Sequence, residues 1–242
     1  MNGKMTIAFC AALAAAAAFA APRANARRAA AADDDAPTSG KEAKITIDQF
    51  PKTGKACQLT APSVQGSSII GANVYAKASS RRWIVLEAKY STFAKWQDQL
   101  TFTWHVLLET KTATENKGNK EGLAPYSYFT TSVTYMNIPM GTHAAGVCLH
   151  PSNLERFGEP KAIGLVITNG KGEVLAGDCE SEVKGIPNHP KDLQSAFWND
   201  QKIMNATTAE GDPMIERRQG LMDRSKTIWA MVNPNDYELV AQ

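Results

Sequence analysis

Residues 99–109 alternate apolar and polar side chains, with Leu107 as the one apolar residue among the polar positions. The apolar positions are Leu100, Phe102, Trp104, Val106 and Leu108. Successive side chains of a β-strand point to opposite faces, whereas an α-helix would spread these positions around its surface. The stretch therefore predicts a long β-strand with one buried face.

Similar patterns extend over residues 44–186. Residues 45–47 alternate, and residues 82–90 predict a strand with apolar side chains on both faces. Residues 127–136 are rich in β-branched and aromatic side chains, and residues 140–149 follow Pro139. Residues 162–168 and 173–177 flank an Asn-Gly-Lys-Gly turn, which predicts a hairpin. A short helix is expected at residues 151–157. Because helices do not alternate with these strands, the sequence predicts a mainly β fold, an antiparallel β-sandwich.

The N-terminus carries an export signal. A basic residue, Lys4, precedes an apolar, alanine-rich run and the small-x-small pattern Ala24-Asn25-Ala26. These features predict a secretory signal peptide over residues 1–26, with cleavage after Ala20, Ala21 or Ala26. Residues 27–43 offer no apolar face to bury and predict a flexible tether.

The charge balance excludes some partners. The chain has 26 Lys and Arg against 24 Asp and Glu, a formal net charge of +2. Nucleic-acid binding and polybasic membrane attachment both need a basic excess, so we expect neither. After removal of the signal peptide, no segment is apolar enough over eighteen residues to span a membrane.

The last segment, residues 187–242, has a different texture. Apolar residues recur at helical spacing within residues 191–202, and Asp212-Pro213 has the composition of a helix start. We expect a second helix from there to about Met222 and a closing strand or extended segment at residues 226–232. This helical and extended segment is too short for a core of its own and is expected to pack on the sandwich.

Three cysteines remain after export: Cys57, Cys148 and Cys179. An oxidising compartment favours pairing, and a Cys148–Cys179 disulfide is the preferred arrangement. Pairing of Cys57 with one of the others, or three free thiols, are the alternatives.

Sequence motifs give no sign of catalysis or of a metal site. The histidines lack HxH, HExxH or CxxC spacing, and the GxSxG, P-loop and GxGxxG patterns are missing. Cys148 and His150 would share a strand face, but no orienting group accompanies them. We therefore expect no metal, no cofactor and no enzymatic activity, with an unrecognised hydrolase as the least favoured alternative.

Four aromatic residues are expected at the surface: Trp96, Tyr126, Tyr128 and Tyr135. Exposed rings on a β-sandwich can stack on the apolar faces of sugars. Tyr126, Tyr128 and Trp96 are accordingly the candidate ligand-binding residues. Tyr128 also begins a row of hydroxyl side chains along one strand face, for which an ordinary solvent-facing strand is the simpler interpretation.

A run near the C-terminus, residues 221–230 followed by Asn235-Asp236-Tyr237, resembles the tail of small exported bacterial proteins with Ig-like sandwiches. Some of these are encoded beside type IV pilus machinery. This chain has Ile228 where the family has proline, and a later proline is missing. The resemblance implies an Ig-like fold and a non-enzymatic surface or periplasmic role. The apolar N-terminal stretch lacks the prepilin pattern, so we do not expect a polymerising pilin.

Together these observations predict an exported structural or protein-interaction module, located in the periplasm or on the cell surface of a bacterium. Its expected partner is another envelope or surface protein, and its expected setting is a type IV pilus-like or other cell-envelope system. The alternative is a carbohydrate-binding or adhesive module that uses exposed tyrosines.

Overall fold

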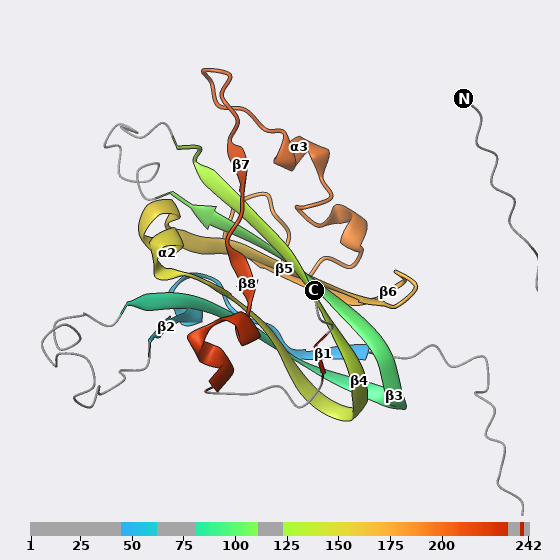
Figure 1. Ribbon diagram of the computed structural model, residues 1–242. Coiled ribbons are helices and arrows are strands. Elements are labelled where there is room, and N and C mark those ends of the chain that lie inside the picture. Colours follow the sequence, from blue (N-terminus) through green and yellow to red (C-terminus); the bar gives the residue numbers. More distant parts are fainter. Residues whose placement is uncertain (1–44, 62–80, 111–122, 232–237, 240–242) are drawn as a thin grey trace, which may run out of the picture. The chain divides into compact units, whose positions relative to one another are not determined.

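The computed structural model describes residues 45–61, 81–110, 123–231 and 238–239, all within one compact unit, Lys41–Gln242. The predicted signal peptide and tether lie outside the described residues. Within these ranges the fold is mainly β, which confirms the predicted fold class (Figure 1).

The strands described here form one sheet of nine. They are β1 (Ile45–Gln49), β2 (Gln58–Thr60), β3 (Arg82–Glu109), β4 (Tyr126–Leu149), β5 (Glu159–Asn169), β6 (Val174–Ser181), β7 (Ile215–Arg218), β8 (Leu221–Asp223) and β9 (Glu238–Leu239). The helices are short: η1 (Gly54–Cys57), α2 (Pro151–Phe157), η2 (Leu193–Ser195), α3 (Gln201–Met204), η3 (Arg224–Lys226) and η4 (Ile228–Met231).

Two long strands organise the sheet. The strand order is β6-β5-β3-β4-β7, with β1 and β2 also on β3, and β8 and β9 also on β4. Each of β3 and β4 joins two segments that the sequence predicts as separate strands, and the two run side by side over their whole length (Figure 1). All pairings are antiparallel except β4 with β7, which is parallel.

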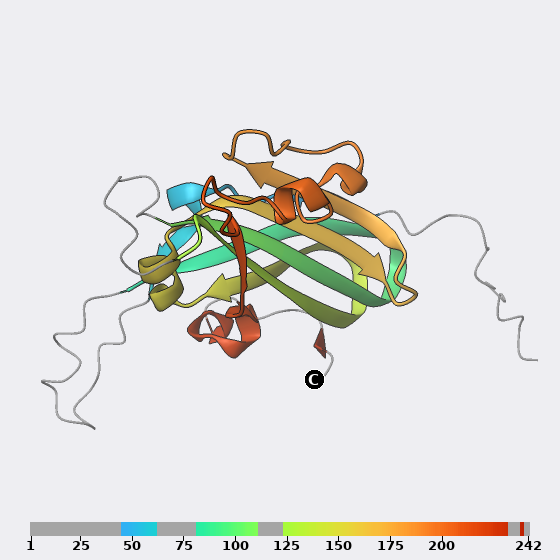
Figure 2. The same ribbon diagram turned by 90° about the horizontal axis from the view of Figure 1, so that it is seen from above.

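The β3–β4 hairpin bends in its middle. The register shifts between Thr92 and Trp96, and two residues of β4 at the same place, Asn137 and Gly141, have positive φ of 54° and 147°. Both halves of the hairpin contribute side chains to one core cluster, such as Ile84 from the first half of β3 and Phe102 from the second. The sheet therefore folds over on itself and encloses its core in a sandwich-like manner, as Figure 2 shows from above.

The short helix expected at Pro151–Phe157 is confirmed as α2. The Nδ1 atom of His150 accepts a hydrogen bond from the backbone N–H of Ser152, which caps the helix start. Gly158 ends the helix with a φ of 86°, a conformation that favours glycine.

The helices expected in the last segment are largely wrong. Residues 191–202 form η2, a turn and the beginning of α3 rather than one helix. The second expected helix is replaced by strands β7 and β8, and the expected closing strand by η3 and η4. Pairing with exposed edges of β4 supplies backbone hydrogen bonds that outweigh the local helix-start signal of Asp212 and Pro213.

In the described part of the chain, no helix is long and apolar enough to cross a membrane.

Candidate functional site

Four exposed apolar side chains come from residues at or beside the bend of the hairpin. Thr92 pairs with Gly141 and Trp96 with Pro139, so three residues of β3 lie opposite Met140 alone. Such a bulge turns side chains out of the regular alternation. Phe93 and Trp96 are 57% exposed and Met140 is 64% exposed. With Met136, these residues form what we call the bend surface.

Hydrogen bonds fix the backbone of this bend. The Thr92 hydroxyl donates to the Pro139 carbonyl at 2.8 Å and accepts from the Gly141 N–H at 3.1 Å. The ring of His143 donates from Nε2 to the same Pro139 carbonyl, also at 2.8 Å. The bend surface is therefore presented by an internally bonded part of the sheet.

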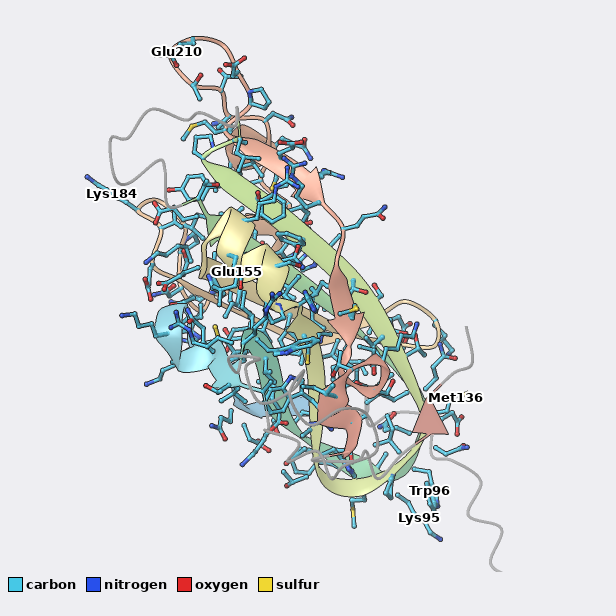
Figure 3. All side chains as sticks on the ribbon, turned by 60° about the vertical axis from the view of Figure 1, so that its left-hand side comes forward. Lys95, Trp96, Met136, Glu155, Lys184 and Glu210 are labelled. Carbon is cyan, nitrogen blue, oxygen red and sulfur yellow. The ribbon has the colours of Figure 1, made fainter. Side chains whose placement is uncertain are left out.

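A cationic side chain lies beside this surface. Figure 3 labels Lys95 next to Trp96, with Met136 at the same end of the hairpin. Lys95 is exposed, as is Asp98 three residues further along β3. The bend surface therefore combines exposed apolar side chains with charged neighbours, and protein interfaces likewise combine apolar and polar contacts.

Tyr128, expected at the surface, is buried at the other end of β4. It is 6% exposed, and its hydroxyl shares a hydrogen bond with Nδ1 of His105, with 2.6 Å between oxygen and nitrogen. Trp198 stacks on His105 with ring centroids 4.4 Å apart and planes 2° from parallel. Phe197 meets the Tyr128 ring edge-on. The expected exposure of Tyr128 is wrong because residues 186–204, which we call the strap, cover this face of the sheet.

Two glycines let the strap approach the sheet closely. A Cβ at Gly164 would lie 2.0 Å from the Trp198 ring, and a Cβ at Gly177 would lie 2.5 Å from a Leu193 methyl group. Real Cβ atoms never come so near other atoms, so the strap packs directly against backbone at both positions. Burial of His105 in this contact lowers its pKa from 6.5 to about 4.

The three candidate binding residues do not form one site. Tyr126 is half-buried, with its hydroxyl 3.5 Å from Oε1 of Glu109. Burial, and then the neighbouring Glu109 carboxylate, raise the pKa of Tyr126. Trp96 is exposed as expected, but it lies at the bend, far along the hairpin from Tyr126 and Tyr128. Tyr135, also expected at the surface, is 1% exposed.

Sequence reasoning missed the other members of the bend surface, Phe93, Met136 and Met140. The available signal was the Pro139-Met140-Gly141 tripeptide, because proline and glycine inside a strand pattern mark a bulge.

The hydroxyl row that follows Tyr128 faces solvent. Thr130 and Ser132 are exposed, and hydroxyl pairs link Ser132 to Thr103 and Thr134 to Thr101 across the strands, each at 2.9 Å. These side chains satisfy one another, which fits the simpler interpretation of a solvent-facing strand.

The expected disulfide between Cys148 and Cys179 is not formed. Cys57, Cys148 and Cys179 are free and buried. Across the sheet, Cys179 pairs with Gly164 of β5, Gly164 with His105 of β3, and His105 with Thr130 of β4. Thr130 lies far along β4 from Cys148, so the topology separates the two sulfur atoms.

Cys148 and His150 are also kept apart in their contacts. The Thr227 hydroxyl lies 3.8 Å from the Cys148 sulfur, and burial raises the pKa of this thiol to about 11. His150 is exposed, contacts the Ser152 hydroxyl at 2.9 Å and packs against Trp83. The described residues bring together no group of three or more His, Cys, Asp or Glu side chains arranged to hold a metal ion.

One protein family matches the chain over residues 54–239, well over half of its length. The chain belongs to this family. A crystal structure of a protein from Akkermansia muciniphila has a similar fold, with a TM-score of 0.55 and 16% sequence identity over 83% of this chain and 95% of that one. No curated protein sequence matches the chain. The family match and the shared fold identify a related bacterial β protein.

The tail run of residues 221–230 has a structural role in this family member. Nη1 of Arg224 lies 2.7 Å from Oε2 of Glu87 on β3, and the Arg224 side chain is only 5% exposed. Asp223 caps η3 by accepting from the Ser225 N–H and accepts a long hydrogen bond, 3.4 Å, from the Tyr135 hydroxyl. The run therefore fastens the tail to β3 and β4.

Proposed function

We propose that this protein is a non-enzymatic exported interaction module of the bacterial envelope, which binds a protein partner through the bend surface. The observation that carries the proposal is the exposure of Phe93, Trp96, Met136 and Met140 on a backbone that hydrogen bonds hold in place. Exposed apolar side chains that gather in one place, instead of being scattered singly, mark interaction sites on soluble domains.

The family match and the fold shared with a bacterial protein support a structural role. The tail resemblance to exported proteins encoded near type IV pilus machinery supports a role as an accessory protein of a pilus-like or other envelope system. The predicted signal peptide supports export. The choice between periplasm and cell surface belongs to the same proposal and follows from where the partner is found.

The chemistry of the bend surface favours a protein over a glycan. A sugar site combines stacking rings with polar groups that bond the sugar hydroxyls, whereas Phe93, Met136 and Met140 offer none. Methionine and aromatic side chains are instead enriched at protein interfaces. Tyr128, one of the candidate residues for stacking on a sugar, lies beneath the strap.

Site-specific photo-crosslinking in intact producing cells tests the proposal. A photoreactive amino acid would replace Phe93 in one variant and Val174 in another, since both side chains are 57% exposed. We expect a discrete protein adduct from position 93 and none from position 174. The same adducts from both positions, or none from position 93, would refute the proposal. Glycan-array binding that is lost in Trp96→Ala would support the carbohydrate alternative instead.

A further inference from the structure

A cavity of about 440 Å³ lies beside the first half of β3, between the end of β1 and η1. Phe50, Pro51, Lys52 and Cys57 line it from the connecting segment, and Val85, Glu87 and Lys89 line it from β3. Its volume falls within the range of small-ligand sites in proteins. Figure 1 shows β1 and β2 one after the other along β3, and residues 50–57 connect them.

The cavity coincides with a gap in the sheet. β1 pairs with β3 as far as Gln49 opposite Lys89, and β2 resumes with Gln58 opposite Ile84. Among the described residues, positions 85–88 of β3 have no strand partner on this edge. Alternate residues of a strand direct their N–H and C=O groups to the same edge. Two of these four residues therefore present a backbone donor and acceptor toward the gap.

The connecting segment is unable to fill the gap as a strand. Pro51 lacks a backbone N–H and so has no donor for a strand partner. Residues 54–57 form the helix η1, which begins at Gly54 with a φ of 67°. The chain therefore leaves the sheet at Gln49 and returns at Gln58. A short extended peptide entering the cavity would complete the interrupted edge.

The charges around the cavity favour an anion. The Glu87 carboxylate is already paired with Arg224 at 2.7 Å. Lys52 and Lys89 are exposed, and neither has an ion pair among the described contacts. Asp48, the acidic side chain of β1, accepts hydrogen bonds from Thr46 and Ser91. The lining therefore offers two cations to a ligand and one carboxylate that already has a partner. Two further carboxylates, Glu159 and Glu182, act electrostatically on Cys57, and Glu182 is itself paired with Lys161 at 2.7 Å.

The remaining walls are apolar. Phe50, Pro51 and Val85 supply hydrocarbon surface. The Cys57 thiol donates to the Gly54 carbonyl, with 3.1 Å between sulfur and oxygen, and burial raises its pKa to about 12, so it is an uncharged part of the wall. This lining suits an apolar side chain next to the anionic group.

We propose that this cavity binds the carboxyl-terminal end of an extended peptide. The peptide backbone pairs with the free edge of β3, its terminal carboxylate lies against Lys52 and Lys89, and its last side chain packs on Phe50 and Val85. This site is separate from the bend surface and goes beyond the function proposed above.

Titration calorimetry and amide hydrogen exchange on the full chain test the site. The probe is acetyl-Val-Val-Phe with a free carboxylate, compared with the same peptide ending in an amide. We expect the carboxylate peptide to bind, to slow exchange within residues 85–88, and to bind about tenfold more tightly than the amide, as loss of a charge-assisted contact predicts. Equal affinity for both peptides, or an absence of heat and protection at millimolar peptide, overturns the proposal.

Variants separate this site from the rest of the protein. Lys52→Gln with Lys89→Gln is expected to weaken binding about tenfold, because the carboxylate loses both cations. Lys184→Gln, which alters an exposed lysine on the loop after β6, is the matched control and should leave affinity unchanged. Phe93→Ser should also bind the peptide normally, so failure of this site and failure of the bend surface are distinguishable. Unchanged affinity in the double variant contradicts the assignment of the two lysines.

Discussion

Arg224 of the C-terminal tail is paired with Glu87 of β3, with 2.7 Å between Nη1 and Oε2. The arginine side chain is 5% exposed and the glutamate 35% exposed, so the pair joins a buried cation to a partly solvated carboxylate. A buried charge that loses a partner costs more than an exposed one, because water does not replace the contact.

Glu87→Gln should therefore lower the free energy of unfolding by about 1–3 kcal/mol, since Arg224 would lose a counter-ion while it stays buried. Glu216→Gln is the control, because its partner Arg218 is 25% exposed and solvent screens that pair. A loss below about 1 kcal/mol is expected there. Urea unfolding measures the free energy of unfolding of each variant. Equal losses would show that the Arg224–Glu87 pair stabilises the fold no more than the more exposed Arg218–Glu216 pair does.

Gly164→Ala should disrupt the strap. Its new Cβ would lie 2.0 Å from the Trp198 ring, so the ring must leave its stack on His105. Overpacking of this kind costs about 1–3 kcal/mol. Gly170→Ala is the matched control, because its nearest neighbour, Gln99, is at an ordinary contact distance of 3.6 Å. Urea unfolding and tryptophan fluorescence should change for position 164 alone, and similar changes in both variants would contradict the described packing.

The burial of His105 predicts that the protein loses stability in mild acid. Burial lowers its pKa from 6.5 to about 4, so the unfolded chain binds this proton at a higher pH than the folded chain. The free energy of unfolding should be unaffected by His105 above about pH 6.5. It should fall by about 1.4 kcal/mol per pH unit between there and about pH 4, with no further loss below.

The measurement is urea unfolding of wild type and His105→Gln between pH 7 and pH 4.5. We expect a shallower pH dependence in the variant, whatever its stability at pH 7. His189 does not mask this effect. A hydrogen bond and charge from Asp178 raise the pKa of His189. Its contribution to the free energy of unfolding is therefore complete below pH 6.5 and is lost only as the pH rises through that raised pKa. Parallel pH profiles would contradict the burial of His105.

The three described cysteines should behave as buried thiols. Burial raises the pKa of Cys57 and Cys179 to about 12 and that of Cys148 to about 11, so the reactive thiolate is scarce at pH 8. Alkylation of the native protein should be slow, and alkylation in denaturant should be rapid and complete. Non-reducing peptide mapping that found Cys148 linked to Cys179 would contradict the separation of these residues in the sheet.

Most strands could be predicted from the sequence because one face of each is buried. Alternation at Leu100 and Phe102 reports that burial directly. Alternation does not report whether the opposite face is open to water. Tyr128 lies on that second face, and only the strap, which comes much later in the chain, buries it. Its expected exposure was wrong for this reason.

The last segment was predicted less well because its conformation depends on tertiary contacts. Leu193 has helical spacing with Ala196 and Phe197 in the sequence, yet the positions of Leu193 and Trp198 are set by contacts with Gly177 and Gly164. Asp212 and Pro213 have the composition of a helix start, yet pairing with β4 turns the following residues into strand. The bend surface was missed because it depends on a bulge that breaks the alternation at Met140.

The central claim is that the bend surface is open in the isolated protein and covered by a partner in the envelope. Oxidative footprinting of Met140, which is 64% exposed, tests it in purified protein and in intact producing cells. The account predicts rapid oxidation of Met140 in the purified protein and several-fold slower oxidation in cells, relative to peptides from β6. Equal oxidation of Met140 in both samples would contradict the account.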